Sequence, residues 1–245
     1  MMQDDTSAAQ VRVATAGWAV PRAVADAFPG EGTGLERYAA RLNAAEINST
    51  FYRSHRPSTY ARWAATTPAD FRFSIKLPRG ISHEARLVDA QDLIAKFCDE
   101  VGHLGAKLGP LLVQLPPSLA LDPRPHDRFF DDLRKHWTGQ VVCEPRHASW
   151  LGREAVAMLV HWRVSRVAAD PARAPLAAQP GGWTGLVYWR LHGSPRTYWS
   201  SYDDAALAML AGRLSAAESR ETWCVFDNTA SGAAAANALT LQAML

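Results

Sequence analysis

Residues 186–193 read LVYWRLHG, and this stretch combines a strand pattern with buried charge. Tyr188, Arg190 and His192 alternate with Trp189 and Leu191, which is the two-residue period of a β-strand. Charged side chains are almost never fully buried unless they are paired. The stretch therefore predicts a strand that carries a polar site on one face.

Seven further runs of β-branched, aromatic or aliphatic residues bounded by turn signals also predict strands. They are residues 11–18, 45–52, 71–77, 111–115, 141–145, 164–169 and 222–228, with 186–191 as the seventh strand in chain order. Apolar residues at helical spacing predict helices in most of the gaps, including 58–66, 93–104, 129–137, 203–214 and 233–245. Residues 171–184 hold too much proline and glycine for a helix, so one crossover is expected to be a loop.

Alternating strands and helices predict an α/β fold with a parallel sheet. Eight units in 245 residues give about 31 residues per unit, which suits a single TIM-like (β/α)8 barrel of parallel strands. A doubly wound open sheet is the alternative, but residues 16–19 (AGWA) lack its glycine-rich first turn.

Composition narrows the class of protein. The chain is 48% hydrophobic with a net charge of +2, so it can bury a large core and has no overall charge that favours nucleic acid. No apolar run approaches the roughly 20 residues that span a membrane. Three widely spaced cysteines argue against a disulfide framework. We expect a cytoplasmic protein with a poorly ordered start at residues 1–10 and one domain at 11–245.

Polar side chains gather where the predicted strands end, which is where barrel enzymes place their active sites. They are Glu46 and Asn48 on the second strand, Lys76 on the third, Gln114 on the fourth, Glu144, Arg146 and His147 after the fifth, Arg190 and His192 on the seventh, Tyr198 on the loop that follows it, and Asp227 and Asn228 on the eighth. A paired ionic network of Lys76 or Arg190 with Glu46 or Glu144, retained for packing, is the structural alternative.

Several segments together resemble a known family. They are residues 46–52 (EINSTFY), 63–76 (WAATTPADFRFSIK), 112–117 (LVQLPP), 144–150 (EPRHASW), 188–193 (YWRLHG), 198–202 and 226–229 (FDNT). In this order they are similar to the family named for domain of unknown function 72, over nearly the whole chain. The resemblance implies a TIM-like barrel and supplies no established reaction.

Two departures from the family pattern bear on the site. Residues 19–30 (AVPRAVADAFPG) replace a Trp-Gly-Phe-Tyr-Pro-like stretch at the rim near the first strand. Asp227 stands where the family usually has the first of two asparagines. If Asp227 faces the pocket, it adds a negative charge that can alter ligand preference.

The favoured function is an enzyme that acts on a small anionic substrate. Arginine forks such as those of Arg146 and Arg190 bind phosphate or carboxylate in bidentate fashion. Glu46 and Glu144 are expected to serve as acid and base, with Lys76 and His192 as further catalytic groups. Hydrolysis, isomerisation and lyase chemistry all stay open. We also expect Glu144→Gln and Arg190→Ala to keep the fold and to lose anion binding.

Three alternatives remain. A divalent metal is one, with Glu46, Glu144, Asp170, His147 and His192 as the available ligands, although nearby cations oppose it. No cofactor is otherwise predicted. Lys76 as an imine-forming nucleophile is the second. A non-catalytic binding protein is the third, with nucleic acid disfavoured by the +2 charge. The sequence leaves the oligomeric state open.

Overall fold

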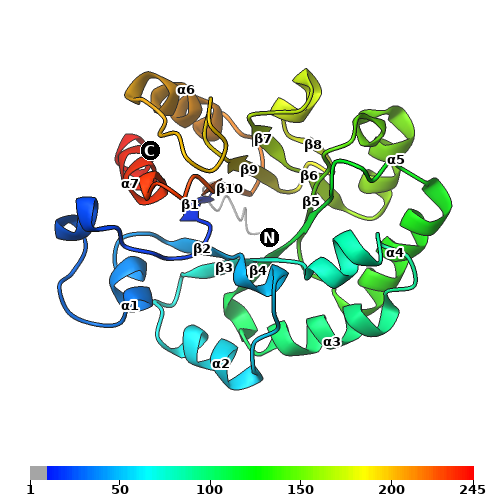
Figure 1. Ribbon diagram of the computed structural model, residues 1–245, viewed down its shortest axis with the longest axis horizontal. Coiled ribbons are helices and arrows are strands. Elements are labelled where there is room, and N and C mark those ends of the chain that lie inside the picture. Colours follow the sequence, from blue (N-terminus) through cyan, green and yellow to red (C-terminus); the bar gives the residue numbers. More distant parts are fainter. Residues whose placement is uncertain (1–9) are drawn as a thin grey trace, which may run out of the picture.

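A computed structural model describes residues 10–245, which form a mixed α/β fold (Figure 1). The strands are β1 (Gln10–Thr15), β2 (Ala44–Ile47), β3 (Arg72–Lys76), β4 (Leu108–Gln114), β5 (Val141–Glu144), β6 (Val164–Arg166), β7 (Ala168–Asp170), β8 (Gly181–Gly182), β9 (Val187–Leu191) and β10 (Glu221–Phe226). The tail expected at residues 1–10 lies outside the described residues, apart from Gln10, which begins β1.

Helices surround the strands and cover their outer side (Figure 1). The α-helices are α1 (Gly34–Ala39), α2 (Pro57–Ala65), α3 (Gln91–Gly102), α4 (Pro123–His136), α5 (Arg153–His161), α6 (Asp204–Ser215) and α7 (Ala233–Met244). Shorter turns are the 3₁₀ helices at Arg22–Ala27, Ser49–Phe51, Gly105–Lys107, Ala148–Leu151 and Pro175–Ala178, and a π-helical turn at Gly80–Glu84. Proline in the first turn favours α2 and α4, and Asp203 caps α6 by accepting from Ala206 N.

The strands pair in two sheets. One has the order β1-β10-β9-β7, and the other has the order β2-β3-β4-β5-β6-β8. The pairs are parallel except β6–β8, which is antiparallel. The prediction of an α/β fold with parallel strands is therefore confirmed apart from β8.

The two sheets approach each other at two places. Ala16 forms an isolated bridge with Glu46, and the next amide, Gly17 N, donates to Glu46 O at 2.8 Å. At the other side the predicted strand 164–169 is divided between the sheets. Val167 N still donates to Cys143 O of β5 at 2.9 Å, whereas Ala168 already pairs with Trp189 of β9. The ladders of the described residues are thus interrupted and do not form one continuous closed sheet.

Other predicted segments also differ in part from the structure. The second strand ends at Ile47 instead of residue 52, because Asn48 takes helical backbone angles and starts a 3₁₀ turn. Thr50 Oγ1 donates to Ile47 O at 2.9 Å and to Lys76 O at 2.6 Å, which ties this turn to the end of β3. The crossover at 171–184 holds no α-helix, as predicted, but it does contain a 3₁₀ turn and β8.

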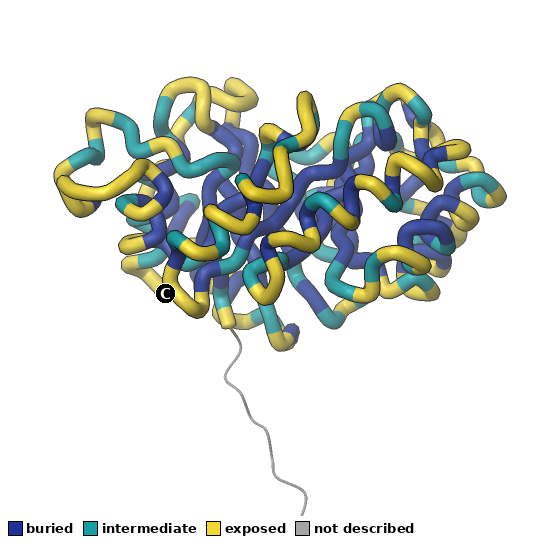
Figure 2. The backbone as a smooth tube through the Cα atoms, turned by 90° about the horizontal axis from the view of Figure 1, so that it is seen from below, coloured by how far each residue is buried: buried dark blue, intermediate teal, exposed yellow. Residues whose placement is uncertain are grey.

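The strand interiors are buried, and exposure is concentrated in the loops and on the outer helix surfaces (Figure 2). A small apolar cluster takes one or two side chains from each of several strands: Ala14, Ala44, Leu112, Val142, Val167, Leu186, Tyr188, Trp223 and Val225. Successive residues on one face of a strand are two apart. The same faces therefore continue into Glu46, Gln114, Glu144, Arg190 and Asp227. An apolar layer supports a polar layer at the C-terminal ends of the strands.

Candidate functional site

The polar layer is built around Arg190, which is 0% exposed. Its guanidinium binds Glu46 in bidentate fashion, with Nη2–Oε1 at 2.8 Å and Nε–Oε2 at 3.0 Å. It also contacts Glu144 Oε2 at 3.2 Å through Nη1, and Asp227 Oδ2 at 3.0 Å through Nη2. Burial alone would lower the pKa of Arg190, but the three carboxylates outweigh it and raise that pKa. Arg190 therefore holds Glu46, Glu144 and Asp227 together within the polar layer.

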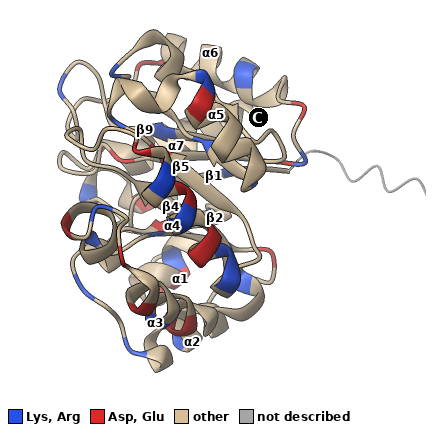
Figure 3. Ribbon diagram, turned by 90° about the vertical axis from the view of Figure 1, so that its right-hand side faces the viewer, with Lys and Arg blue, Asp and Glu red and all other residues tan. Residues whose placement is uncertain are grey.

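Basic and acidic segments lie close together around the strand ends (Figure 3). Asp227 faces this cluster and places a carboxylate inside it. Burial alone would raise the pKa of Asp227, but Arg190 and His192 lower it. Asp227 therefore contributes a negative charge next to Arg190 and His192.

His192 lies between two carboxylates. Its Nδ1 is 2.9 Å from Asp227 Oδ2, and its Nε2 is 2.9 Å from Glu144 Oε1. Burial alone would lower the pKa of His192, but Glu144 and Asp227 outweigh it and raise that pKa. Arg146 Nη2 lies 3.3 Å from the same Nε2. When Nε2 carries a proton it can therefore donate to Glu144 Oε1. When it carries none it can accept from Arg146 Nη2.

The backbone turns sharply directly after His192. Gly193 has φ +89°, and a Cβ there would lie 2.7 Å from Ser200 O and 3.0 Å from Asn228 Cβ. Only glycine avoids both the left-handed backbone cost and this close approach. Gly193 N donates to the Tyr202 hydroxyl at 2.9 Å, which packs the following loop against the strand end. This turn fixes the place of the imidazole.

Proton binding by His192 is expected to make stability depend on pH. A pKa raised on folding adds stability below the unfolded value, and that stability is lost as pH rises through the folded pKa. The difference in free energy of unfolding between wild type and His192→Gln should therefore fall as pH rises above 6.5, by at most about 1.4 kcal/mol per pH unit. Urea unfolding of both proteins from pH 6 to 9 measures it, and a constant difference would contradict the assignment.

Glu144 joins His192 to the other side of the layer. Its Oε2 accepts from Gln114 Nε2 at 2.9 Å, and its Oε1 lies 3.1 Å from Arg146 Nη2. Burial alone would raise the pKa of Glu144, but His192 and Arg190 lower it well below its ordinary value. Glu144 is therefore ionised at neutral pH and accepts hydrogen bonds.

Lys76 behaves differently from the arginines. It is 7% exposed, and its Nζ makes no hydrogen bond or ion pair with any described residue. The ammonium instead lies 4.1 Å from the centre of the Phe51 ring. Burial and Arg190 lower the pKa of Lys76 to about 8, although Glu46, Glu144 and Asp227 oppose the change. The ionic-network alternative thus describes Arg190 and not Lys76.

A cavity of about 330 Å³ opens beside this layer. Glu144, Arg146 and His192 line it from the strand ends, and Arg173 and Thr197 line it from loops. A smaller cavity of about 200 Å³ shares Arg146 and Arg173. The sequence reasoning missed Arg173, which is exposed in the loop after β7. Its position directly after a strand end was the signal that could have found it.

Four other predicted site residues take different places. His147 lines the smaller cavity and caps the turn at 148–151, where its Nδ1 accepts from Ser149 N at 3.3 Å. Asn228 Nδ2 donates to Ser200 O and to Asn237 Oδ1, each at 2.9 Å. Asn48 begins the turn after β2, and its buried Oδ1 has no partner among the described residues. Tyr198 is half exposed, with its ring centre 5.6 Å from that of His192.

Tyr188 was not among the predicted site residues, although its alternation with Arg190 placed it on the same face. Its hydroxyl is 3.1 Å from Glu46 Oε2 and 2.8 Å from Ser74 Oγ. Burial raises its pKa well above the ordinary range. Tyr188 therefore contacts Glu46 from the apolar layer beneath and helps to fix that carboxylate.

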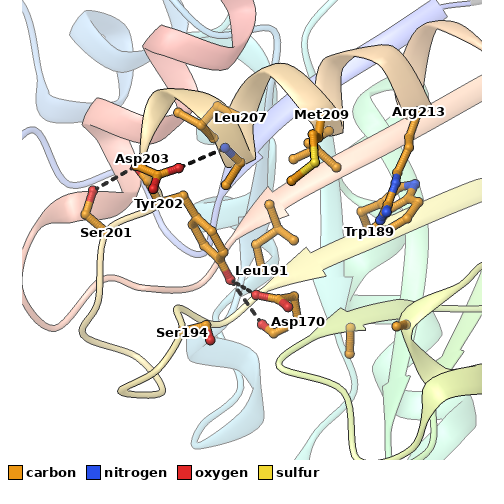
Figure 4. Close-up of a pocket in the computed structure, with 14 residues that line it drawn as sticks. Asp170, Trp189, Leu191, Ser194, Ser201, Tyr202, Asp203, Leu207, Met209 and Arg213 are labelled. Atoms are coloured by element: carbon orange, nitrogen blue, oxygen red, sulfur yellow. Dashed lines mark hydrogen bonds between the residues drawn. The ribbon is translucent and has the colours of Figure 1, made fainter.

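A third cavity, of about 360 Å³, lies between α6 and β9 (Figure 4). Trp189 and Leu191 border it, and these residues alternate with Arg190 along β9. The cavity therefore lies on the opposite face of the strand from the polar layer. At its edge the Tyr202 hydroxyl donates to Asp170 Oδ2 at 2.7 Å (Figure 4). The crossover that precedes β9 contains no α-helix to cover this face.

The described residues contain neither a metal-binding cluster nor a membrane-spanning helix. No group of three or more His, Cys, Asp and Glu side chains in residues 10–245 is arranged to hold a metal ion. Within the same residues, no helix combines the length and the apolar character needed to cross a membrane.

The comparisons with known proteins point to one family. The family model described as "Protein of unknown function DUF72" matches residues 12–245. The chain belongs to the DUF72 family. The resemblance found in the sequence motifs is therefore confirmed.

Two curated relatives of this DUF72 chain are UPF0759 proteins YecE. The protein of Escherichia coli strain K12 is 33% identical over 154 residues, which cover 60% of this chain and 56% of the relative. The protein of Escherichia coli O157:H7 is 39% identical over 84 residues, which cover 34% of this chain and 31% of the relative. The matches thus span about half of the first relative and a third of the second.

Solved structures of DUF72 family proteins share the fold. The protein of Enterococcus faecalis V583 has a TM-score of 0.80 at 21% identity, covering 96% of this chain and 95% of that chain. The protein of Thermotoga maritima MSB8 has a TM-score of 0.76 at 24% identity, covering 96% of this chain and 98% of that chain. Both likenesses concern the fold alone.

Proposed function

We propose that this DUF72 protein is an enzyme that binds a small anionic molecule, with a phosphate or carboxylate group, at the C-terminal ends of the strands. One observation carries the proposal: the 330 Å³ cavity brings Arg146 and Arg173 together with the Glu144–His192 pair. Arginine forks suit phosphate and carboxylate, and a histidine paired with carboxylates suits proton transfer.

The charge of the polar layer supports an anionic ligand. The carboxylates Glu46, Glu144 and Asp227 are paired with Arg146, Arg190 and His192. Arg173 adds a further cation at the cavity wall, and it pairs with none of these carboxylates. Carboxylates inside the layer accept hydrogen bonds from arginine, which disfavours the divalent-metal alternative.

We propose that the strands form a TIM-like barrel with eight strand positions. In this arrangement β6 and β7 share one position, β8 lies outside the ring, and the order is β1-β2-β3-β4-β5-β6/β7-β9-β10. The Ala16–Glu46 bridge and the passage of the chain from β6 to β7 support the two junctions. This order places the polar layer at the end where barrel enzymes hold substrate.

His192 is the proposed acid–base residue. Asp227 fixes Nδ1, so Nε2 gives up or takes the proton between Glu144 and a ligand in the cavity. Glu46 uses both carboxylate oxygens on Arg190, so we assign it a positioning role in place of the acid–base role expected from the sequence. Hydrolysis, isomerisation and lyase chemistry all need such a group. Cytoplasmic location and the absence of nucleic-acid binding stay predictions.

Anion binding by Arg146 and Arg173 can be measured with anions that lack an aldehyde or ketone group. We expect inorganic phosphate, glycerol 3-phosphate or lactate to bind wild type in isothermal titration calorimetry, and Arg146→Gln and Arg173→Gln each to weaken Kd by about tenfold, or ~1.4 kcal/mol. Arg213→Gln is the matched control, because Arg213 lines the other cavity. Equal weakening by Arg213→Gln, or no binding to wild type, would contradict the proposal.

A further inference from the structure

Lys76 is a buried cation for which the cluster provides no anionic partner. Glu46 and Ser74 are register partners in the β2–β3 ladder, and Lys76 lies two residues beyond Ser74. Its side chain is therefore on the same face as the polar layer, one step nearer the C-terminal end. It is 7% exposed, and Nζ contacts the face of Phe51. A lysine beside three carboxylates would ordinarily form an ion pair.

The other cations contact five of the six oxygens of these three carboxylates. Arg190 occupies both oxygens of Glu46 and one oxygen of Glu144. Arg146 and His192 occupy the second oxygen of Glu144, and His192 and Arg190 share Asp227 Oδ2. The charged form of Lys76 thus receives little direct stabilisation, while burial and Arg190 disfavour it. Such an environment gives Lys76 a larger fraction of neutral amine near pH 8 than an ordinary lysine has.

We propose that Lys76 is a nucleophile that forms an imine with a small carbonyl compound whose anionic group is held by Arg146 and Arg173. The substrate class is a carbonyl compound with a nearby carboxylate or phosphate, such as a 2-oxo acid or a phosphorylated aldehyde or ketone. This inference rests on the proposed anion site and specifies the chemistry of its ligand.

The step balances without an external oxidant or reductant. The neutral Lys76 amine attacks the carbonyl carbon, a C–N bond forms, and the C=O π electrons move to oxygen. Proton transfers make that oxygen a hydroxyl and then water, which leaves as the C=N bond forms. The net reaction consumes one proton, supplied by protonated His192, and gives a protonated imine and water. Arg190 is paired with carboxylates and stays positively charged. Its charge disfavours the ammonium form of Lys76.

The lysines of this chain provide internal comparisons. Lys96 and Lys135 are exposed, with side-chain exposures of 68% and 58%. With a pKa of about 8 against an ordinary 10.5, Lys76 has roughly 300-fold more neutral amine at pH 7 than an ordinary lysine. We therefore expect selective labelling of Lys76.

The test is reductive trapping followed by peptide mass mapping. The full chain is incubated at pH 7.5 with pyruvate or dihydroxyacetone phosphate and with sodium cyanoborohydride, which converts an imine into a stable secondary amine. We expect at least tenfold more adduct on Lys76 than on Lys96 or Lys135 with one or both compounds. Acetone and dihydroxyacetone, the neutral counterparts, should label Lys76 at least tenfold less. The two anionic compounds separate a carboxylate from a phosphate as the recognised group.

Lys76→Arg keeps the charge and cannot form the imine, so it should lose the specific adduct and keep binding of phosphate or lactate. Labelling of Lys76 no greater than that of Lys96 with both anionic compounds would overturn the inference, and so would equal labelling by the neutral compounds. The two proposals fail separately. Loss of trapping with intact binding of anions that lack an aldehyde or ketone overturns only the imine. Trapping without any such binding overturns the anion site, and with it the assignment of Arg146 and Arg173 to the substrate, but not the imine at Lys76.

Discussion

Arg190→Met is expected to lower the free energy of unfolding by about 3–5 kcal/mol. Arg190 is fully buried and contacts Glu46, Glu144 and Asp227. Removal of one member of a buried ionic network leaves the remaining charges without compensation, and this cost exceeds the loss of the contacts themselves. The sequence alone led us to expect that Arg190→Ala would leave the fold intact. Because Arg190 is fully buried, we now expect its replacement to lower the stability of the fold.

Urea unfolding at pH 7 measures this effect. Arg79→Met is the matched control, because Arg79 pairs with Glu84 at 3.2 Å on the surface, where both side chains are exposed. An exposed pair of this kind contributes about 0–1 kcal/mol. A loss for Arg190→Met no larger than that of the control would show that Arg190 does not hold the carboxylates together.

Lys76→Met is expected to raise the free energy of unfolding at pH 7 by about 1–3 kcal/mol. The pKa of Lys76 is lowered to about 8 in the folded protein from an ordinary 10.5, so the folded state carries the lysine charge at a cost. Methionine fills similar space without a charge and packs well against an aromatic ring such as Phe51. A gain in stability on removal of a residue is typical of functional groups.

The pH dependence of this gain follows from the sign of the shift. Between pH 8 and 10.5 the unfolded chain binds more protons at Lys76 than the folded chain, so wild-type stability rises with pH. The advantage of Lys76→Met should therefore shrink across that range. Lys96→Met, at an exposed position in α3, should change stability by less than about 0.5 kcal/mol. A destabilised Lys76→Met protein would contradict the account of Lys76 as a cation without a partner.

The period of side chains along the strands made much of this site predictable. Alternation at 188–192 placed Arg190 and His192 on one face, and the strand ends placed Glu46, Glu144 and Asp227 near them. These groups do meet in the structure. Local pattern was sufficient here because every parallel strand in a sheet ends at the same edge.

Residues beyond the strand ends were harder to predict. The period-two pattern continued through Asn48, but the chain enters a 3₁₀ turn there, stabilised by Thr50. His147 and Asn228 follow strands too, yet they hydrogen-bond to a turn and to the loop near Ser200. Loop conformation depends on such non-local contacts, which strand periodicity does not encode. Arg173 reaches the cavity from a loop whose path the sequence pattern did not specify.

The choice of ion-pair partners also could not be predicted from the sequence. Lys76 and Arg190 both had Glu46 and Glu144 as candidate partners, and only Arg190 is paired with them. Its planar fork satisfies several oxygens at once, whereas an ammonium is a single point charge. Partner choice in a buried cluster depends on distances of a few tenths of an ångström, which follow from the full packing of the strands.

The most direct test of the central claim is a crystal structure of the protein with selenate, a tetrahedral dianion whose position is located by anomalous scattering. The account predicts selenate in the 330 Å³ cavity, within hydrogen-bond distance of Arg146 and Arg173 and beside the Glu144–His192 pair. Selenate bound beside Arg213 in the cavity under α6, with none at Arg146, would contradict it.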